Sequence, residues 1–139
     1  DINLKSVLQI DEIGGCCESK ETSRTIEKSA LYFAIENGSF ILTKLLLENP
    51  KIDINFAIYD ENDDDELVTL QDKNTLFLAV EKQSFEIVQL LIKHPGINLN
   101  YESTYYIYNN YENEIYKKTA LQLASAKHYS NIEQLLSKK

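Results

Sequence analysis

Residues with chemical potential cluster first in DENDDDE, Asp60–Glu66, which packs six carboxylates into seven residues of a 139-residue chain. An EF-hand calcium loop starting at Asp60 needs glycine at its sixth position and glutamate at its twelfth, but the sequence has Asp65 and Gln71 there. We therefore expect a solvated, acidic loop tip, whose charge attracts a basic partner. The alternative is a weak metal response through Asp60, Asn62 and Asp64.

The thiols and imidazoles offer a second candidate site. Cys16 and Cys17 are adjacent, and His94 and His128 are the only histidines. A nucleophile–base pair or a zinc site needs further groups converging on one point, and two neighbouring thiols fix no such geometry. The sequence therefore predicts no catalytic, cofactor-binding or metal-binding residue. Both cysteines are expected to be free thiols, which indicates a reducing, cytoplasmic location.

Tyrosines provide the third cluster. The stretch YESTYYIYNNYENEIY, Tyr101–Tyr116, holds six of the nine tyrosines. Tyrosine combines a broad contact area with few rotatable bonds and a polar tip, and it is common in protein-binding surfaces. Alternatively, Tyr106 and Tyr108 pack one face of a hairpin by strand alternation. Both interpretations stay open, for different tyrosines.

The elements that must position these residues repeat along the chain. The segment EKSALYFAIENGSFILTKLLLENPKIDIN (27–55) recurs as DKNTLFLAVEKQSFEIVQLLIKHPGINLN (72–100) and, shortened, as KKTALQLASAKHYSNIEQLLSKK (117–139). Leu31, Leu76 and Leu121 stand 45 residues apart, as do Pro50 and Pro95. Such a period indicates a repeat architecture, in which each unit buries an apolar face against its neighbour. We therefore expect the three leucines to occupy equivalent buried positions.

Each unit reads as two short amphipathic helices, because its apolar residues recur at helical spacing. Ser29, Asn74 and Thr119 precede the first helix of each unit and are expected to cap it. Gly38 suits the turn between the two helices, where a positive φ costs glycine least. The later units carry Gln83 and His128 at that place.

The openings SALYFA, NTLFLA and TALQLA resemble the T-P-L-H-x-A motif of the ankyrin repeat. The G-x-x-x-x-V-x-x-L-L and D-x-N elements that follow resemble its second helix and turn. The resemblance covers 1–3 and most of 28–139. It implies an all-α, ankyrin-type solenoid of stacked helix-turn-helix units, with finger loops that are enlarged because the period exceeds the usual ankyrin unit of about 33 residues.

The enlarged fingers lie at 4–28, 56–73 and 101–118. FAIY and ELVTL flank the acidic tip, and we expect them to pair as an extended β-hairpin. In the first finger, a helix through Leu4, Val7 and Leu8 competes with a hairpin.

The chain is expected to form one domain, 1–139. A preceding finger (1–27) leads to repeats at 28–72 and 73–117 and to a C-terminal capping repeat at 118–139. Ser130, Glu133 and Ser137 replace the apolar Phe85, Val88 and Ile92 of the middle unit, as a terminal repeat requires. Asp1-Ile2-Asn3 resembles the end of a repeat, so we expect further ankyrin repeats N-terminal to this segment. We also expect a monomer.

Composition and resemblance together favour a protein-interaction module without catalysis. The net charge of −8 argues against nucleic-acid binding, and no apolar run reaches the roughly 18 residues of a membrane span. An unknown partner protein is expected to bind the concave groove and the fingers. Its expected anchors are Tyr105, Tyr106, Tyr108 and Tyr111.

Charged residues bordering the groove are expected to orient that partner; they are Lys73, Glu81, Lys82 and Lys118. Lys28, Lys73 and Lys118 again stand 45 residues apart and would meet an acidic partner. The alternative is that these lysines are inherited repeat sequence with solvated side chains. As a different class of function, the array would be the targeting or scaffold arm of a larger enzyme.

Overall fold

The computed structural model describes residues 6–8, 26–64, 67–108 and 113–139, with side chains described for 29–59, 71–108 and 113–139. Cys16, Cys17 and Tyr111 lie outside these ranges. Helices in the described residues form three consecutive pairs. They are α1 (Ala30–Glu36) with α2 (Phe40–Leu47), α3 (Thr75–Glu81) with α4 (Phe85–Lys93), and α5 (Ala120–Ala126) with α6 (Ser130–Ser137).

The first helix of each pair begins at the expected cap. The hydroxyl of Ser29 accepts a hydrogen bond from the Tyr32 N–H at 3.1 Å, and the side-chain oxygen of Asn74 accepts one from the Phe77 N–H at 2.8 Å. Thr119 forms a reciprocal capping box with Gln122. Each acceptor satisfies an amide that has no partner within its helix, so the three capping predictions are confirmed.

The turn between the helices has the same geometry in all three pairs. Gly38 has φ +66°, and Gln83 and His128 have φ 57° and 58°. Only glycine enters this left-handed region without a Cβ penalty. The two later turns therefore hold a strained residue where the first one holds glycine.

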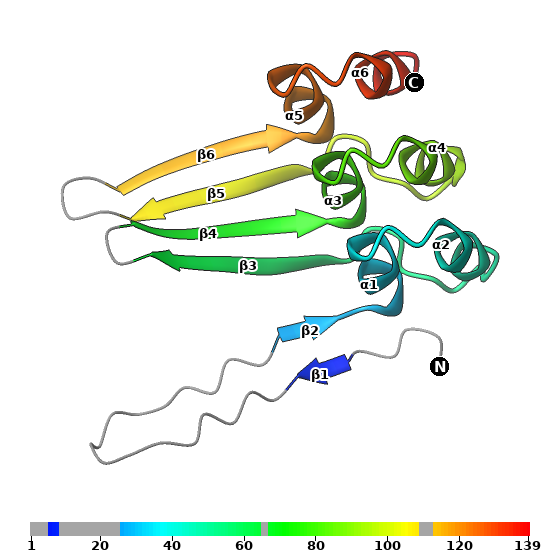
Figure 1. The fold of residues 1–139 in the computed structure, drawn as a ribbon, viewed down its shortest axis with the longest axis horizontal. Coiled ribbons are helices and arrows are strands. Elements are labelled where there is room, and N and C mark those ends of the chain that lie inside the picture. The colour runs from blue at the N-terminus through cyan, green and yellow to red at the C-terminus, as the bar shows by residue number, and fades with distance from the viewer. Residues whose placement is uncertain (1–5, 9–25, 65–66, 109–112) are drawn as a thin grey trace.

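The helix pairs stack as three layers (Figure 1). α1 packs on α3 and α3 on α5, while α2 packs on α4 and α4 on α6. Leu31 and Leu76 are fully buried between layers, as expected, but Leu121 is 36% exposed. The expectation was wrong for Leu121 because, in the described part of the chain, no helix lies beyond α5. Ser130 and Ser137 are likewise exposed on α6.

The fingers are strands, and they join across repeats. β3 (Ala57–Asp64), β4 (Leu67–Asn74), β5 (Glu102–Tyr108) and β6 (Asn113–Thr119) form one antiparallel sheet in that order. It projects from the side of the stack formed by α1, α3 and α5 (Figure 1). The all-α assignment is therefore only partly confirmed: it holds for the stack, while the fingers, expected as extended hairpins or loops, join into one sheet. β4 and β5 belong to neighbouring hairpins, and pairing satisfies the backbone groups that each would leave open at its edge.

Two local expectations are also resolved. A hairpin forms here as expected, but the predicted pairing of FAIY with ELVTL is wrong: Ala57–Tyr59 pair with 72–74, while 67–70 pair with 61–64. β3 runs on through Asp64, so most of the acidic stretch lies in a strand instead of a loop tip. In the first finger, β1 (Ser6–Leu8) pairs antiparallel with β2 (Ile26–Lys28). The competing helix is therefore wrong for residues 6–8.

Candidate partner-binding surface

Tyr105 stands where the sheet meets the helices. It projects from β5 and lies edge-on to Phe77 of α3, with ring centroids 6.1 Å apart. The Lys118 ammonium, from β6, lies 5.7 Å from the centroid of the Tyr105 ring. Phe77 is fully buried and Tyr105 is partly exposed, so the helix layer fixes the ring while one side of it meets solvent. A cation over such a ring is attracted by its quadrupole.

A salt bridge borders this ring. The Lys73 ammonium of β4 lies 3.0 and 3.1 Å from the two carboxylate oxygens of Glu81, on α3. Lys73 is only 7% exposed, so the interpretation of this lysine as a solvated side chain is wrong. Burial, and next the Glu81 carboxylate, raise the pKa of the Tyr105 hydroxyl to about 12, against a smaller lowering by a hydrogen bond with Gln71. The Tyr105 hydroxyl therefore stays neutral at physiological pH.

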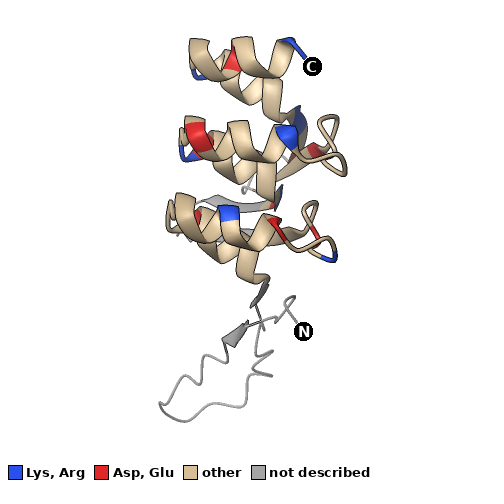
Figure 2. Ribbon diagram, turned by 90° about the vertical axis from the view of Figure 1, so that its right-hand side faces the viewer, with Lys and Arg blue, Asp and Glu red and all other residues tan. Residues whose placement is uncertain are grey.

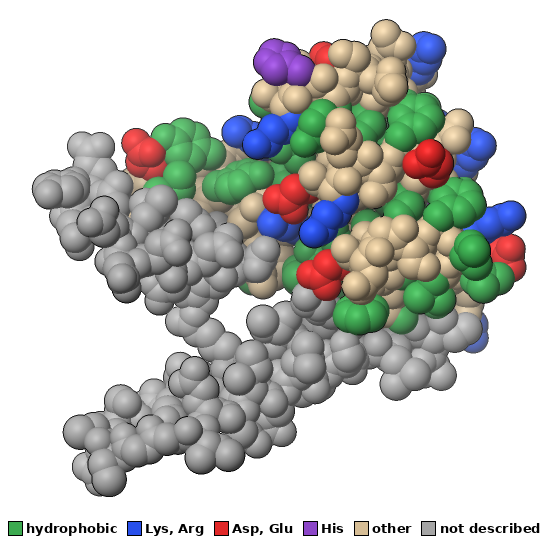
Figure 3. All heavy atoms as spheres, viewed as in Figure 1, with side chains coloured by type: hydrophobic (Ala, Val, Ile, Leu, Met, Phe, Trp, Pro, Cys, Tyr) green, Lys and Arg blue, Asp and Glu red, His purple; other side chains and the backbone are tan. Residues whose placement is uncertain are grey.

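Lys73, Glu81, Tyr105 and Lys118 together are called the inner patch. Strand alternation places Lys73, Tyr105 and Lys118 on the face of the sheet that turns toward α3. In Figure 3, basic and acidic side chains gather where the sheet meets the helices. The inner patch thus presents an aromatic ring, one paired lysine and one exposed lysine on a rigid support.

Tyr106 and Tyr108 lie on the opposite, outer face of the sheet. Their rings stack on each other with centroids 6.5 Å apart and an interplanar angle of 5°. On the same face, the Tyr101 hydroxyl donates to the Asp72 carboxylate at 3.1 Å, and burial together with Asp72 raises the pKa of this tyrosine. The backbone N–H of Thr104 also donates to the Asp72 carboxylate. Asp72, on β4, is therefore hydrogen-bonded both to β5 and to Tyr101, which directly precedes β5.

The eight residues singled out from the sequence are thus only partly brought together. Four form the inner patch, and the stacked tyrosines face the other way. Lys82 is exposed at the C-terminal end of α3. Sequence reasoning missed Phe77 and Asp72. The period-two alternation of YYIY was the signal that separates Tyr105 from its neighbours, whereas nothing local marks Asp72.

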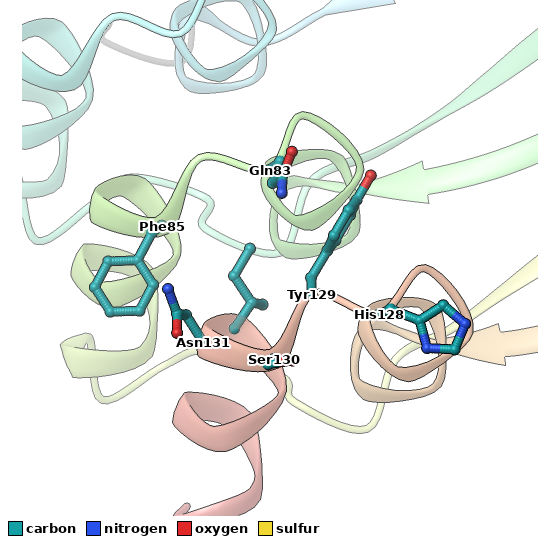
Figure 4. A pocket seen from close by; sticks show the side chains of 7 residues that line it. Gln83, Phe85, His128, Tyr129, Ser130 and Asn131 are labelled. Atoms are coloured by element: carbon teal, nitrogen blue, oxygen red, sulfur yellow. The ribbon is translucent and has the colours of Figure 1, made fainter.

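A shallow pocket of about 380 Å³ lies between the starts of α4 and α6. It is lined by Gln83, Phe85, His128, Tyr129, Ser130, Asn131 and Ile132. In Figure 4 the His128 ring points away from the other lining side chains, so it faces no nucleophile there. His94 instead accepts a hydrogen bond from the Gly96 N–H at 3.2 Å, a structural role in the loop after α4.

The described residues contain neither a cluster of metal-ligating side chains nor a helix fit to span a membrane. Among them, no three histidine, cysteine, aspartate or glutamate side chains gather as a metal site would require. The side chains of Asp60, Asn62 and Asp64 lie outside those described. No helix in the described ranges has the length and apolarity needed to cross a membrane. Over the described helices, Figure 2 shows basic and acidic residues interspersed.

Stacked helix pairs with projecting hairpins define the class of protein: a helical-repeat solenoid. Comparison with known families identifies which one. The model for ankyrin repeats, in three copies, matches residues 8–103, and the chain belongs to the ankyrin repeat family. No curated protein matches the chain. Ankyrin repeats generally serve as protein–protein interaction modules and are typically non-catalytic.

Proposed function

We propose that the chain binds a partner protein through the inner patch, with the fingers extending the contact, and that it performs no catalysis itself. The observation that carries this proposal is the Lys118 ammonium held over the Tyr105 ring, which Phe77 braces from beneath. An aromatic anchor that is already ordered loses little entropy on binding. Such anchors contribute much of the affinity in protein interfaces.

The charges suggest the partner's chemistry. Lys73 is engaged with Glu81, so its role is to position Tyr105 and the neighbouring strand. Lys118 is exposed at the patch, and Lys82 is exposed at the C-terminal end of α3, next to Glu81 in the sequence. These two lysines offer positive charge to a partner segment. We therefore infer that the contacted segment carries acidic side chains, and that it engages a monomer of this chain in the cytoplasm.

A charge reversal with a matched control tests the proposal. The chain, tagged and expressed in its source cells, is cross-linked, and the captured proteins are quantified by mass spectrometry. We expect Lys118→Glu to reduce recovery of the partner about tenfold or more, since it places a carboxylate against an acidic segment. Lys117→Glu makes the same charge change one residue away, on the outer face, and is expected to leave recovery unchanged.

The outer face supplies the decisive comparison. Tyr106→Ser combined with Tyr108→Ser removes the stacked pair and leaves the inner patch intact. Partner recovery should survive this double substitution. If recovery instead falls with the double variant and persists with Lys118→Glu, the binding surface is the outer face and the proposal is wrong.

A further inference from the structure

One side of the first helix pair carries large apolar residues at high exposure. Phe33 of α1 is 51% exposed, and Ile41, Leu42 and Leu45 of α2 are 73%, 43% and 58% exposed. These four residues are called the first-layer face. Isolated exposed apolar residues are ordinary, but a group on neighbouring helical positions marks an interaction surface.

The later layers show what covers these positions. The residues 45 and 90 positions after Phe33 are Leu78 and Leu123, which are 3% and 5% exposed. Those after Leu42 are Ile87 and Ile132, both 2% exposed. The contacts of α3 with α1 and of α4 with α2, and likewise of the third layer with the second, account for this burial. At Phe33 and Leu42, the first-layer face is therefore equivalent to two interfaces that the molecule already contains, and Leu45 corresponds to the half-buried Leu90 and Leu135.

The occupant must present apolar side chains. In the second layer, Val88 and Ile92 of α4 are 0% and 3% exposed, and α4 packs against α6. The exposed end of the stack offers Ser130, Glu133 and Ser137 at the equivalent positions of α6. A second copy stacking head to tail would therefore set polar groups against Leu42 and Leu45, with a desolvation cost.

We propose that the first-layer face docks a further helix pair of the same type, carrying apolar residues at the positions of Phe85, Val88 and Ile92. Ile41 widens this face, because the later layers carry Glu86 and Asn131 at its position. The inference concerns a surface separate from the inner patch. It does not depend on the proposed function.

The chain itself supplies the probe. Residues 73–97, which contain α3 and α4, are joined ahead of Asp1, because 1–3 match the 98–100 segment that normally follows them. We expect the extended chain to melt about 5 °C or more above the 139-residue chain, since nearest-neighbour interfaces stabilise stacked repeats. We also expect slower amide hydrogen exchange in α2.

A substitution at Leu42 tests whether the rise in melting temperature comes from the first-layer face. Leu42→Lys should change the melting temperature by at most about 1 °C in the 139-residue chain, where residue 42 meets solvent. In the extended chain the same substitution should remove most of the rise, because it buries a charge. Equal effects of Leu42→Lys in both chains would overturn the proposal.

Two further measurements distinguish a docked helix pair from other possible occupants of the first-layer face. In a control extension, the added copies of Phe85, Val88 and Ile92 are changed to Ser, Glu and Ser, as in α6, and no rise in melting temperature is expected. A rise with this control would mean that apolar docking is not the cause. Sedimentation of the 139-residue chain tests self-association, and a dimer abolished by Leu42→Lys would assign the face to a second copy instead.

Discussion

Asn74 carries the most informative stability test. This cap of α3 is 1% exposed, and its side-chain oxygen accepts the Phe77 N–H at 2.8 Å. Its side-chain nitrogen finds no hydrogen-bond partner among the described residues. An unsatisfied buried donor costs about 1–3 kcal/mol. The same cap is made in the other two layers by Ser29 and Thr119, whose side chains carry a hydroxyl and no amide group.

Asn74→Ser should therefore stabilise the fold. Serine keeps the capping acceptor and removes the unpaired N–H₂ group. Its smaller side chain makes fewer packing contacts, which offsets part of the stabilisation. We expect the free energy of unfolding to rise by about 1 kcal/mol, which corresponds to about 3–4 °C for a chain of this size. Asn74→Ala should fall below Asn74→Ser by about 1 kcal/mol, because it loses the cap as well.

Urea unfolding followed by circular dichroism measures both differences on one scale. The parallel variants Ser29→Ala and Thr119→Ala give the value of a cap without an orphan amide. If Asn74→Ser unfolds at lower urea than the parent chain, the Asn74 amide is hydrogen-bonded in solution and the reasoning fails.

Three further predictions follow from local geometry. Gln83→Gly and His128→Gly should each raise the free energy of unfolding by about 0.5–1 kcal/mol by urea titration, because both residues hold the positive φ that Gly38 adopts without a Cβ. The fold raises the pKa of Tyr105 to about 12, above its usual value of 10. The stability that this tyrosine contributes is therefore complete below pH 10 and is lost as pH rises from 10 to about 12. Tyr105→Phe should reduce that loss of stability in urea titrations at pH 8 to 12. Asp72→Ala should speed amide hydrogen exchange in β5 and β6 while leaving α4 protected, and uniform acceleration across the chain would contradict this.

The helix stack was readable from the sequence because each of its determinants is local. A cap needs an acceptor one residue before the helix, and Ser29, Asn74 and Thr119 supply it in register. The 45-residue period then requires the layers to bury equivalent positions. Leu121 departs from this rule because burial also requires a neighbouring layer. Leu121 lies on the last described layer, where no further helix pair covers it.

The joined sheet and the inner patch were not readable in the same way. Pairing of β4 with β5 depends on the offset between neighbouring layers, which no single hairpin sequence encodes. The salt bridge between Lys73 and Glu81 links a strand to a helix across eight residues, outside the three- and four-residue spacings that mark pairs on one helix. The sequence places the tyrosines in one stretch, and only the strand geometry divides Tyr105 from Tyr106 and Tyr108 between two faces of the sheet.

The pairing of β4 with β5 joins two fingers into one sheet, which affects how their side chains can take part in binding. Separate hairpins of this length would move independently of one another, since an isolated two-stranded hairpin is marginally stable. Here the Asp72 carboxylate accepts from Tyr101 and Thr104, and the Ser103 hydroxyl donates to the Asp72 carbonyl, so the second hairpin is fastened to the first. The side chains of β5 and β6 are then displayed on a four-stranded platform braced by Phe77. Because that platform is ordered before any partner arrives, side chains on strands can act as anchors, a role more often taken by loops.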